Sequence, residues 1–186
     1  MESAPGHPAP PLCVDLDGTL LRSDLLLEST LALLARQPWM LFLLPWWLLR
    51  GKAHLKREVA SRVTLDPATL PYDARVLAHL RANPQRHRVL CTASDEGLVQ
   101  PLAAYLGCFD EVLASDGRRN LAGTNKARAL VERFGERGFD YAGNGPVDLA
   151  VWSHARRALV VNAGPALARA AAGRCELEAH WPAQGG

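Results

Sequence analysis

Short apolar runs alternate with helix-like stretches along most of this chain, and that alternation limits the fold more than any other feature. It predicts a parallel sheet covered by helices, because parallel neighbours need long crossover connections. The strand-like runs lie at Leu12 to Asp15, His87 to Thr92, Glu111 to Ala114, Asp140 to Ala142 and Ala158 to Asn162. The sequence therefore predicts an α/β fold.

Two of the intervening helices have clear sequence boundaries. One begins near Ser94, which we expect to be its N-cap, and stops at Gly107. The other runs from Thr124 to Gly135 and carries apolar residues at helical spacing. The alanine-rich stretch 166–172 is a further candidate helix.

Between Leu21 and about Pro84 the sequence reads as helical segments without a convincing strand. Within it, Gln37 to Leu49 carries no charge and contains three tryptophans. This run is shorter than the roughly 20 residues that cross a bilayer. Two interpretations stay open and are compatible: a helix pair packed into a cap, or a tryptophan-rich hairpin in a membrane interface above the basic Arg50, Lys52, Lys56 and Arg57.

Composition narrows the class of protein. With 186 residues, 48% of them hydrophobic, the chain can form one core and is not disordered. The 21 basic and 19 acidic residues are too balanced to indicate a nucleic-acid-binding protein. The four cysteines lack metal-ligand spacing and are expected to be reduced core residues. Residues 1–11 lack a signal sequence, so we expect a disordered, cytoplasmic tail.

The most informative motif is Asp15-Leu16-Asp17-Gly18-Thr19, which directly follows the first apolar run. Two close carboxylates favour a shared divalent cation, which would offset their repulsion. One carboxylate could then attack phosphorus while the other moves a proton. A solvated Asp-Gly turn is the structural alternative. A calcium loop of the EF-hand type fits poorly, because its glycine belongs two positions later.

Together with three later motifs, this one resembles the haloacid dehalogenase (HAD) superfamily of aspartate-nucleophile phosphotransferases. The resemblance runs from about Leu12 to Gly164 and implies a Rossmann-like, three-layer core. It implies that Asp15 is the nucleophile and Asp17 the general acid and base. Dehalogenase members usually lack the second aspartate, so Asp17 points to phosphoryl transfer.

The second and third motifs would bind the transferred phosphoryl group. A hydroxyl residue at the end of a strand is matched by Thr92, with Ser94 as the less favoured choice. A lysine at a helix start is matched by Lys126, whose cation would hold Asp15 and the phosphoryl group together. Taken alone, each residue has an ordinary structural explanation, as a strand end or a solvated side chain.

The fourth motif departs from the family pattern. The family has Gly-Asp-x-x-x-Asp, whereas this chain reads Gly143-Asn144-Gly145-Pro146-Val147-Asp148. The resemblance implies a Mg²⁺ site formed by Asp15, Asp17 through its carbonyl, Asn144 and Asp148. Asn144 removes one negative charge, so affinity for a hard cation should fall. Asp148 could compensate directly or through water; alternatively, it only caps the next helix.

The helical segment lies where this superfamily inserts its first type of cap. We expect a tail at 1–11, a core at 12–22 and 67–186, and a helical cap at 23–66 that selects the substrate. A narrower resemblance, to the HAD-like domain that precedes UbiA-type prenyltransferase domains, rests on Asp15 to Glu28, the Pro-Trp and Leu-rich segment, Val131 to Gly135 and Asp140 to Asn144.

These expectations lead to two hypotheses about function. The first is a cytoplasmic Mg²⁺-dependent phosphohydrolase that forms an aspartyl-phosphate from a small or lipid-linked phosphate ester. The second is a catalytically weak module that binds a membrane surface or a prenyltransferase partner. Asn144 and the tryptophan-rich run motivate the second hypothesis. The otherwise complete catalytic set of Asp15, Asp17, Thr92 and Lys126 argues for the first.

Overall fold

A six-stranded parallel sheet organises the computed structural model, which describes residues 9–116 and 120–183 without the side chains of Lys52 and Ala53. The strand order is β3-β2-β1-β4-β5-β6. The strands are β1 (Leu12–Val14), β2 (Arg88–Asp95), β3 (Glu111–Ser115), β4 (Asp140–Gly143), β5 (Arg157–Val161) and β6 (Glu176–Trp181). The predicted α/β fold with a parallel sheet is confirmed.

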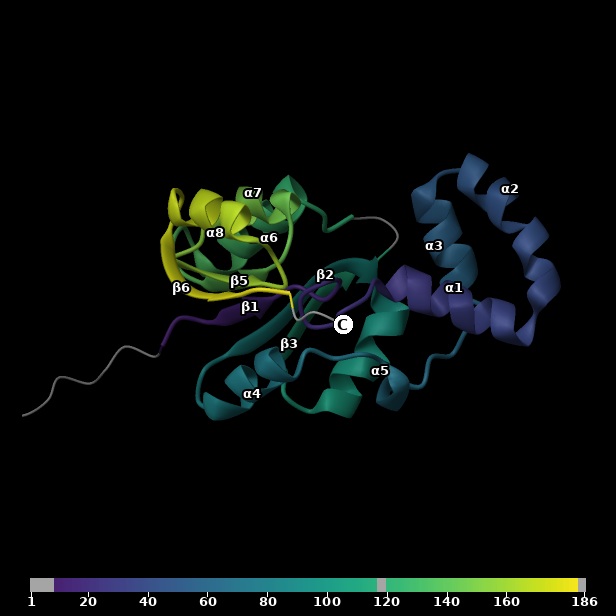
Figure 1. Cartoon of the computed structure of the whole chain (residues 1–186), viewed down its shortest axis with the longest axis horizontal. Coiled ribbons are helices and arrows are strands. Elements are labelled where there is room, and N and C mark those ends of the chain that lie inside the picture. The colour runs from purple at the N-terminus through teal and green to yellow at the C-terminus, as the bar shows by residue number, and fades with distance from the viewer. Residues whose placement is uncertain (1–8, 117–119, 184–186) are drawn as a thin grey trace, which may run out of the picture.

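Alternate side chains of the strands enter two separate cores, which makes the molecule three layers deep. In β1, Leu12 and Val14 enter one core, whereas Cys13 enters the other. The first core is covered by α4 (Ala74–Ala82) and α5 (Glu96–Leu106), below the sheet in Figure 1. The second is covered by α6 (Thr124–Phe134), α7 (Leu149–Trp152) and α8 (Pro165–Ala172), above it in Figure 1.

The helices between β1 and β2 form a separate cluster to one side of the sheet (Figure 1). They are α1 (Leu25–Arg36), the 3₁₀ turn η1 (Pro38–Phe42), α2 (Leu44–Leu49) and α3 (Lys52–Ala60), and we call them the helical insertion. Their shared core contains Leu33, Met40, Trp47, Val59 and Val63. Within the uncharged run 37–49, the structure has the 3₁₀ turn η1 followed by the short helix α2. Across the described residues, no helix has the length and apolar character that a bilayer crossing requires.

Two details differ from the sequence expectations. Strand β6 was not predicted, although Glu176 to Trp181 alternates polar and larger apolar residues and pairs with β5 at the sheet edge. Ser94 is not the N-cap of α5, because β2 continues through Asp95 and the Asp95 carboxylate accepts the Gly97 N–H. The Ser94 hydroxyl is used elsewhere, in a contact with Asp17.

The strand order places a topological switch point between β1 and β4. From β1 the chain builds outward to β2 and β3, and then returns to add β4 on the other side. In open parallel sheets, ligands bind in the crevice at the carboxyl ends of the strands flanking such a point. The predicted site residues that follow β1 and β4 belong to this crevice.

Candidate active site

The loop after β1 begins with Asp15 and turns sharply at Gly18. The Asp15 N–H donates to the Ala142 carbonyl at 3.0 Å, which anchors the loop to β4. Gly18 has a φ of +75°, and a Cβ there would collide with the Asn144 side chain. Both facts require glycine at position 18. The close approach also brings the first and fourth sequence motifs together.

Asp15 forms a buried ion pair with Lys126, which lies 111 residues away in the first turn of α6. The Lys126 Nζ donates to the Asp15 Oδ1 at 2.5 Å and to the Tyr141 hydroxyl at 3.0 Å. The other Asp15 oxygen, Oδ2, accepts no hydrogen bond from any described residue. One oxygen of this carboxylate is therefore held by a cation and the other remains available.

Burial controls the protonation of this pair. It raises the pKa of the Asp15 carboxyl to about 7, although the Lys126 cation opposes the shift. Burial alone would lower the pKa of the Lys126 ammonium, but the Asp15 charge outweighs it and raises that pKa above its usual range. Lys126 is therefore a permanent cation beside Asp15 at neutral pH.

Asp17 binds the first turn of the helical insertion. Its Oδ1 accepts the Leu25 N–H at 2.7 Å, and its Oδ2 accepts the Ser94 hydroxyl at 2.8 Å. Burial raises the pKa of the Asp17 carboxyl, against these two hydrogen bonds, which lower it. Asp17 therefore takes up a proton more readily than an exposed aspartate, and its position is linked to that of α1.

Thr92 and Ser94 occupy the end of β2 beside this loop. Thr92 is fully buried, and its hydroxyl oxygen accepts the Ser94 N–H at 3.0 Å. Between them, the Ala93 carbonyl accepts a hydrogen bond at 3.3 Å from the Lys56 ammonium, which extends from α3 of the insertion. Sequence analysis gave Lys56 no part in the site. No local signal distinguishes it, because α3 carries several other charged residues and Lys56 meets the end of β2 only in the folded chain.

Asn144 and Asp148 follow β4. The Asn144 Oδ1 accepts the Thr19 hydroxyl at 3.3 Å. The Asp148 Oδ2 accepts the N–H groups of Asn144 and Gly145, both at 3.0 Å, and its Oδ1 accepts the Tyr141 hydroxyl at 2.8 Å. Both Asp148 oxygens are thus used to shape this loop and to hold Tyr141. Sequence analysis assigned Tyr141 only to a strand, although this tyrosine links Lys126 to Asp148.

Three oxygens at the site keep lone pairs that a hard cation could use. They are the Asp15 Oδ2, the Asp17 carbonyl, which accepts no hydrogen bond from a described residue, and the Asn144 Oδ1 with its one long contact. Oxygen donors of this kind suit Mg²⁺, but only one of the three carries a charge. Among the described residues, no three acidic, histidine or cysteine side chains are grouped to hold a metal.

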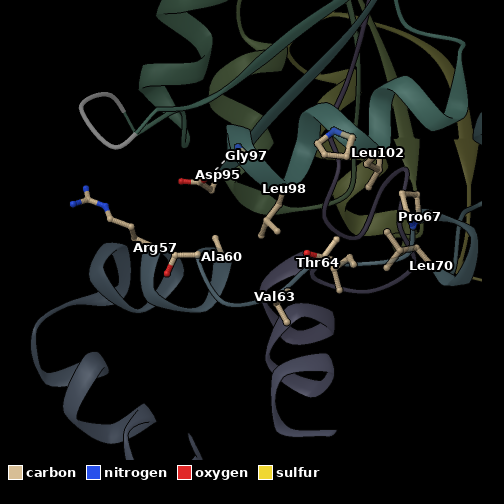
Figure 2. Close-up of a pocket in the computed structure, with 13 residues that line it drawn as sticks. Arg57, Ala60, Val63, Thr64, Pro67, Leu70, Asp95, Gly97, Leu98 and Leu102 are labelled. Carbon is tan, nitrogen blue, oxygen red and sulfur yellow. Dashed lines mark hydrogen bonds between the residues drawn. The ribbon is translucent and has the colours of Figure 1, made fainter. Parts of the chain in front are cut away.

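A cavity of about 430 Å³ lies between the helical insertion and α5 (Figure 2). Its wall is largely apolar and includes Val63, Leu65, Leu70, Leu98 and Leu102. Asp95 and Arg57 line one end, where Asp95 directly follows Ser94 of the site. An apolar space therefore begins beside the end of β2.

No model of a known protein family matches this chain. The uncharacterized protein y4nM of Sinorhizobium fredii is 36% identical over 157 residues, which are 83% of this chain and 30% of y4nM. The chain thus spans about 30% of the length of this curated relative.

Solved structures resemble the chain in fold. The HAD family hydrolase t0658 from Salmonella enterica serovar Typhi matches with a TM-score of 0.61 and 16% identity, over 87% of this chain and 66% of that one. Phosphoserine phosphatase, solved as a phospho-aspartyl intermediate analogue, matches with a TM-score of 0.57 and 15% identity, over 92% of each chain. This chain therefore has the fold of these hydrolases.

Proposed function

We propose that this protein is a phosphohydrolase that uses Asp15 as its nucleophile. The observation that carries the proposal is the buried Asp15 carboxylate with one oxygen held by Lys126 at 2.5 Å and the other left available at the sheet's switch point. A nucleophile needs this arrangement, because the cation fixes the carboxylate while the second oxygen can reach phosphorus. The fold shared with phosphoserine phosphatase and the order of the four motifs support it.

The reaction would proceed in two displacements. First, the Asp15 Oδ2 attacks phosphorus, the bond between phosphorus and the ester oxygen breaks, and Asp17 gives its proton to the departing oxygen. Then water attacks the aspartyl-phosphate, Asp17 takes the proton of that water, and inorganic phosphate leaves with Asp15 restored. The raised pKa of Asp17 supports its role as the acid of the first displacement.

Charge on the transferring oxygens would be offset by Lys126 and by the Thr92 hydroxyl. Mg²⁺ would be held by Asp15, the Asp17 carbonyl and Asn144, and would supply positive charge near the same oxygens. Asp148 would act behind it, because its two oxygens already hold the Asn144 loop and Tyr141. With Asn144 as a neutral ligand, we expect weak affinity for the ion.

The substrate would be a small or lipid-linked phosphate ester. In this proposal residues 12–22 and 67–186 form the core, and residues 23–66 are the cap that selects the substrate. The apolar cavity beside Asp95 supports an ester with an apolar portion, since its wall would exclude water from an alkyl chain. Lys56 would contact the polar part of the ester, because it already approaches the end of β2.

The alternative is a module that has lost most of its activity and binds a membrane surface or a prenyltransferase partner. Asn144 favours it, because an amide replaces a charged ligand. Asn144→Asp restores the family pattern and so separates the two functions experimentally.

Phosphate release from a panel of soluble and lipid-linked phosphate esters, with and without Mg²⁺, tests the proposal. We expect turnover that depends on Mg²⁺ and is lost in Asp15→Asn but kept in the matched control Asp110→Asn. Asp110 binds Arg88 at the start of β3, so the control makes the same chemical change away from the switch point. No turnover by the wild type, together with turnover by Asn144→Asp, would favour the alternative.

A further inference from the structure

Large apolar side chains are concentrated on the outside of the helical insertion. Eight such residues between positions 27 and 49 are exposed, and we call them the insertion face: Leu27, Leu31, Trp39, Leu41, Phe42, Trp46, Leu48 and Leu49. They come from the three consecutive elements α1, η1 and α2, and η1 packs against both helices. Elsewhere in the described residues only Tyr105, Val147 and Leu177 are large, apolar and exposed.

The core of the insertion does not need these side chains. Met40 and Trp47 turn inward and anchor η1 and α2, whereas Phe42 and Leu49 are 83% and 82% exposed. Exposed apolar patches of this kind usually mark an interaction surface. In Figure 1, α2 lies at the end of the molecule remote from α8, so the sheet and its covering helices leave the face open.

Charge around the insertion face is positive. Residues 27–57, which include the whole face, contain five arginines and lysines and one acidic residue, Glu28. Arg36 and Arg50 bracket the uncharged run, and both are exposed. The Arg50 guanidinium lies over the Trp46 ring, 5.3 Å from its centroid. Lys56 points instead toward the end of β2, so it does not belong to the face.

We propose that the insertion face binds the interface of an anionic lipid bilayer. Tryptophan, phenylalanine and leucine would enter the boundary between headgroups and acyl chains, and Arg36 and Arg50 would contact the anionic headgroups. A second copy of this chain is a poorer occupant, because its face would offer one carboxylate, that of Glu28, to the two arginines Arg36 and Arg50. The binding is independent of the phosphohydrolase reaction proposed above.

Co-sedimentation of the purified protein with vesicles tests this proposal. One set contains equal parts of phosphatidylglycerol and phosphatidylcholine, and the other contains phosphatidylcholine alone. We expect stronger binding to the anionic set, weakened by salt, with a blue shift of tryptophan fluorescence as Trp39 and Trp46 leave water. Failure of the wild type to bind anionic vesicles overturns the proposal, even if it binds membranes that contain a prenyltransferase.

Two pairs of variants locate the binding surface. Phe42→Ser with Leu49→Ser should weaken binding at least about tenfold, because both side chains would be buried in lipid. The control Tyr105→Ser, on α5, should bind like the wild type. Arg36→Gln with Arg50→Gln should lower binding to anionic vesicles only, compared with Arg128→Gln and Arg169→Gln on α6 and α8.

The substituted residues are exposed, so the variants should fold, and circular dichroism checks that they do. Unchanged binding by Phe42→Ser with Leu49→Ser would overturn the proposal. So would an equal loss in Tyr105→Ser. A dimer in light scattering that this double variant abolishes, with no vesicle binding by the wild type, would assign the face to a second copy instead.

Discussion

Two buried carboxylates mark opposite ends of the central strands, and they differ in how completely they are bound. Asp140 begins β4, and its oxygens accept hydrogen bonds from Arg156 at 2.9 and 2.6 Å and a further one from Arg86. Asp15 follows β1, and Lys126 binds only one of its oxygens. Both oxygens of Asp140 are therefore bound by guanidinium groups, whereas one oxygen of Asp15 has no hydrogen bond from a described residue.

This difference in hydrogen bonding indicates that Asp140 stabilises the fold, whereas Asp15 has an oxygen left for chemistry. A buried ion pair is tolerated when its polar atoms are hydrogen-bonded, and both oxygens of Asp140 accept hydrogen bonds from arginine. This cluster also ties the entry to β1 to the sheet, because the Asp140 N–H donates to the Pro11 carbonyl and Arg86 donates to the Pro10 carbonyl. At Asp15 the unsatisfied oxygen lies at the switch point, where a ligand can complete it.

Replacement of Asp15 should produce the largest effect. In Asp15→Asn the nucleophilic oxygen is lost, so phosphate release should fall by about 10⁴-fold or more. The melting temperature should also fall, because buried Lys126 loses its charged partner. The fall should be smaller than in the Asp140 variant, where two guanidinium groups lose theirs. Turnover numbers and thermal unfolding of the same preparation provide the measurement. Retained turnover would remove Asp15 from the mechanism.

The converse variant is Asp140→Asn. Two guanidinium groups would lose their buried partner, so the free energy of unfolding should fall by about 3–5 kcal/mol. The folded fraction should keep its turnover, since no atom of this cluster reaches the switch point. Urea unfolding together with activity per folded molecule checks both statements. A selective loss of activity at wild-type stability would show that Asp140 acts in the reaction and not only in folding.

The site at Asp15 should bind a cation more tightly when position 144 carries a negative charge. In Asn144→Asp the loop after β4 gains a carboxylate beside Gly18 and Thr19. If position 144 is a ligand, half-maximal activation should need about 10–100-fold less Mg²⁺. A magnesium titration of activity measures the shift, and isothermal titration calorimetry measures the affinity directly. An unchanged midpoint would mean that position 144 does not contact the ion.

The smallest expected effect concerns Tyr141. Its hydroxyl accepts from Lys126 and donates to Asp148, so Tyr141→Phe removes the link between them but keeps the ring. We expect about a tenfold loss of kcat with KM nearly unchanged, in the range seen when a supporting hydrogen bond at a site is removed. Steady-state kinetics with Tyr105→Phe as a control makes the comparison. A change confined to KM would contradict this positioning role.

Sequence reasoning reached the sheet and the residues that begin the site, because both follow from local patterns. The apolar runs around Cys13 and Val89 identified strands, and the order of motifs singled out Asp15 and Lys126. Contacts between residues far apart in the chain could not be predicted from local patterns. The Ser94 hydroxyl looks like a helix cap from its neighbours alone, and only the folded chain brings Asp17 within 2.8 Å of it. Tyr141 and Lys56 were missed for the same reason.

The hydrogen bond from the Leu25 N–H to the Asp17 carboxylate connects the protonation of Asp17 to the position of α1. The same carboxylate that would transfer the proton also accepts the N–H of the first residue of α1, so a movement of α1 that lengthened this contact would act on Asp17 directly. Loss of this hydrogen bond would raise the pKa of the Asp17 carboxyl, and its return would lower that pKa again. The protonation of Asp17 would then depend on the position of α1 through one 2.7 Å contact.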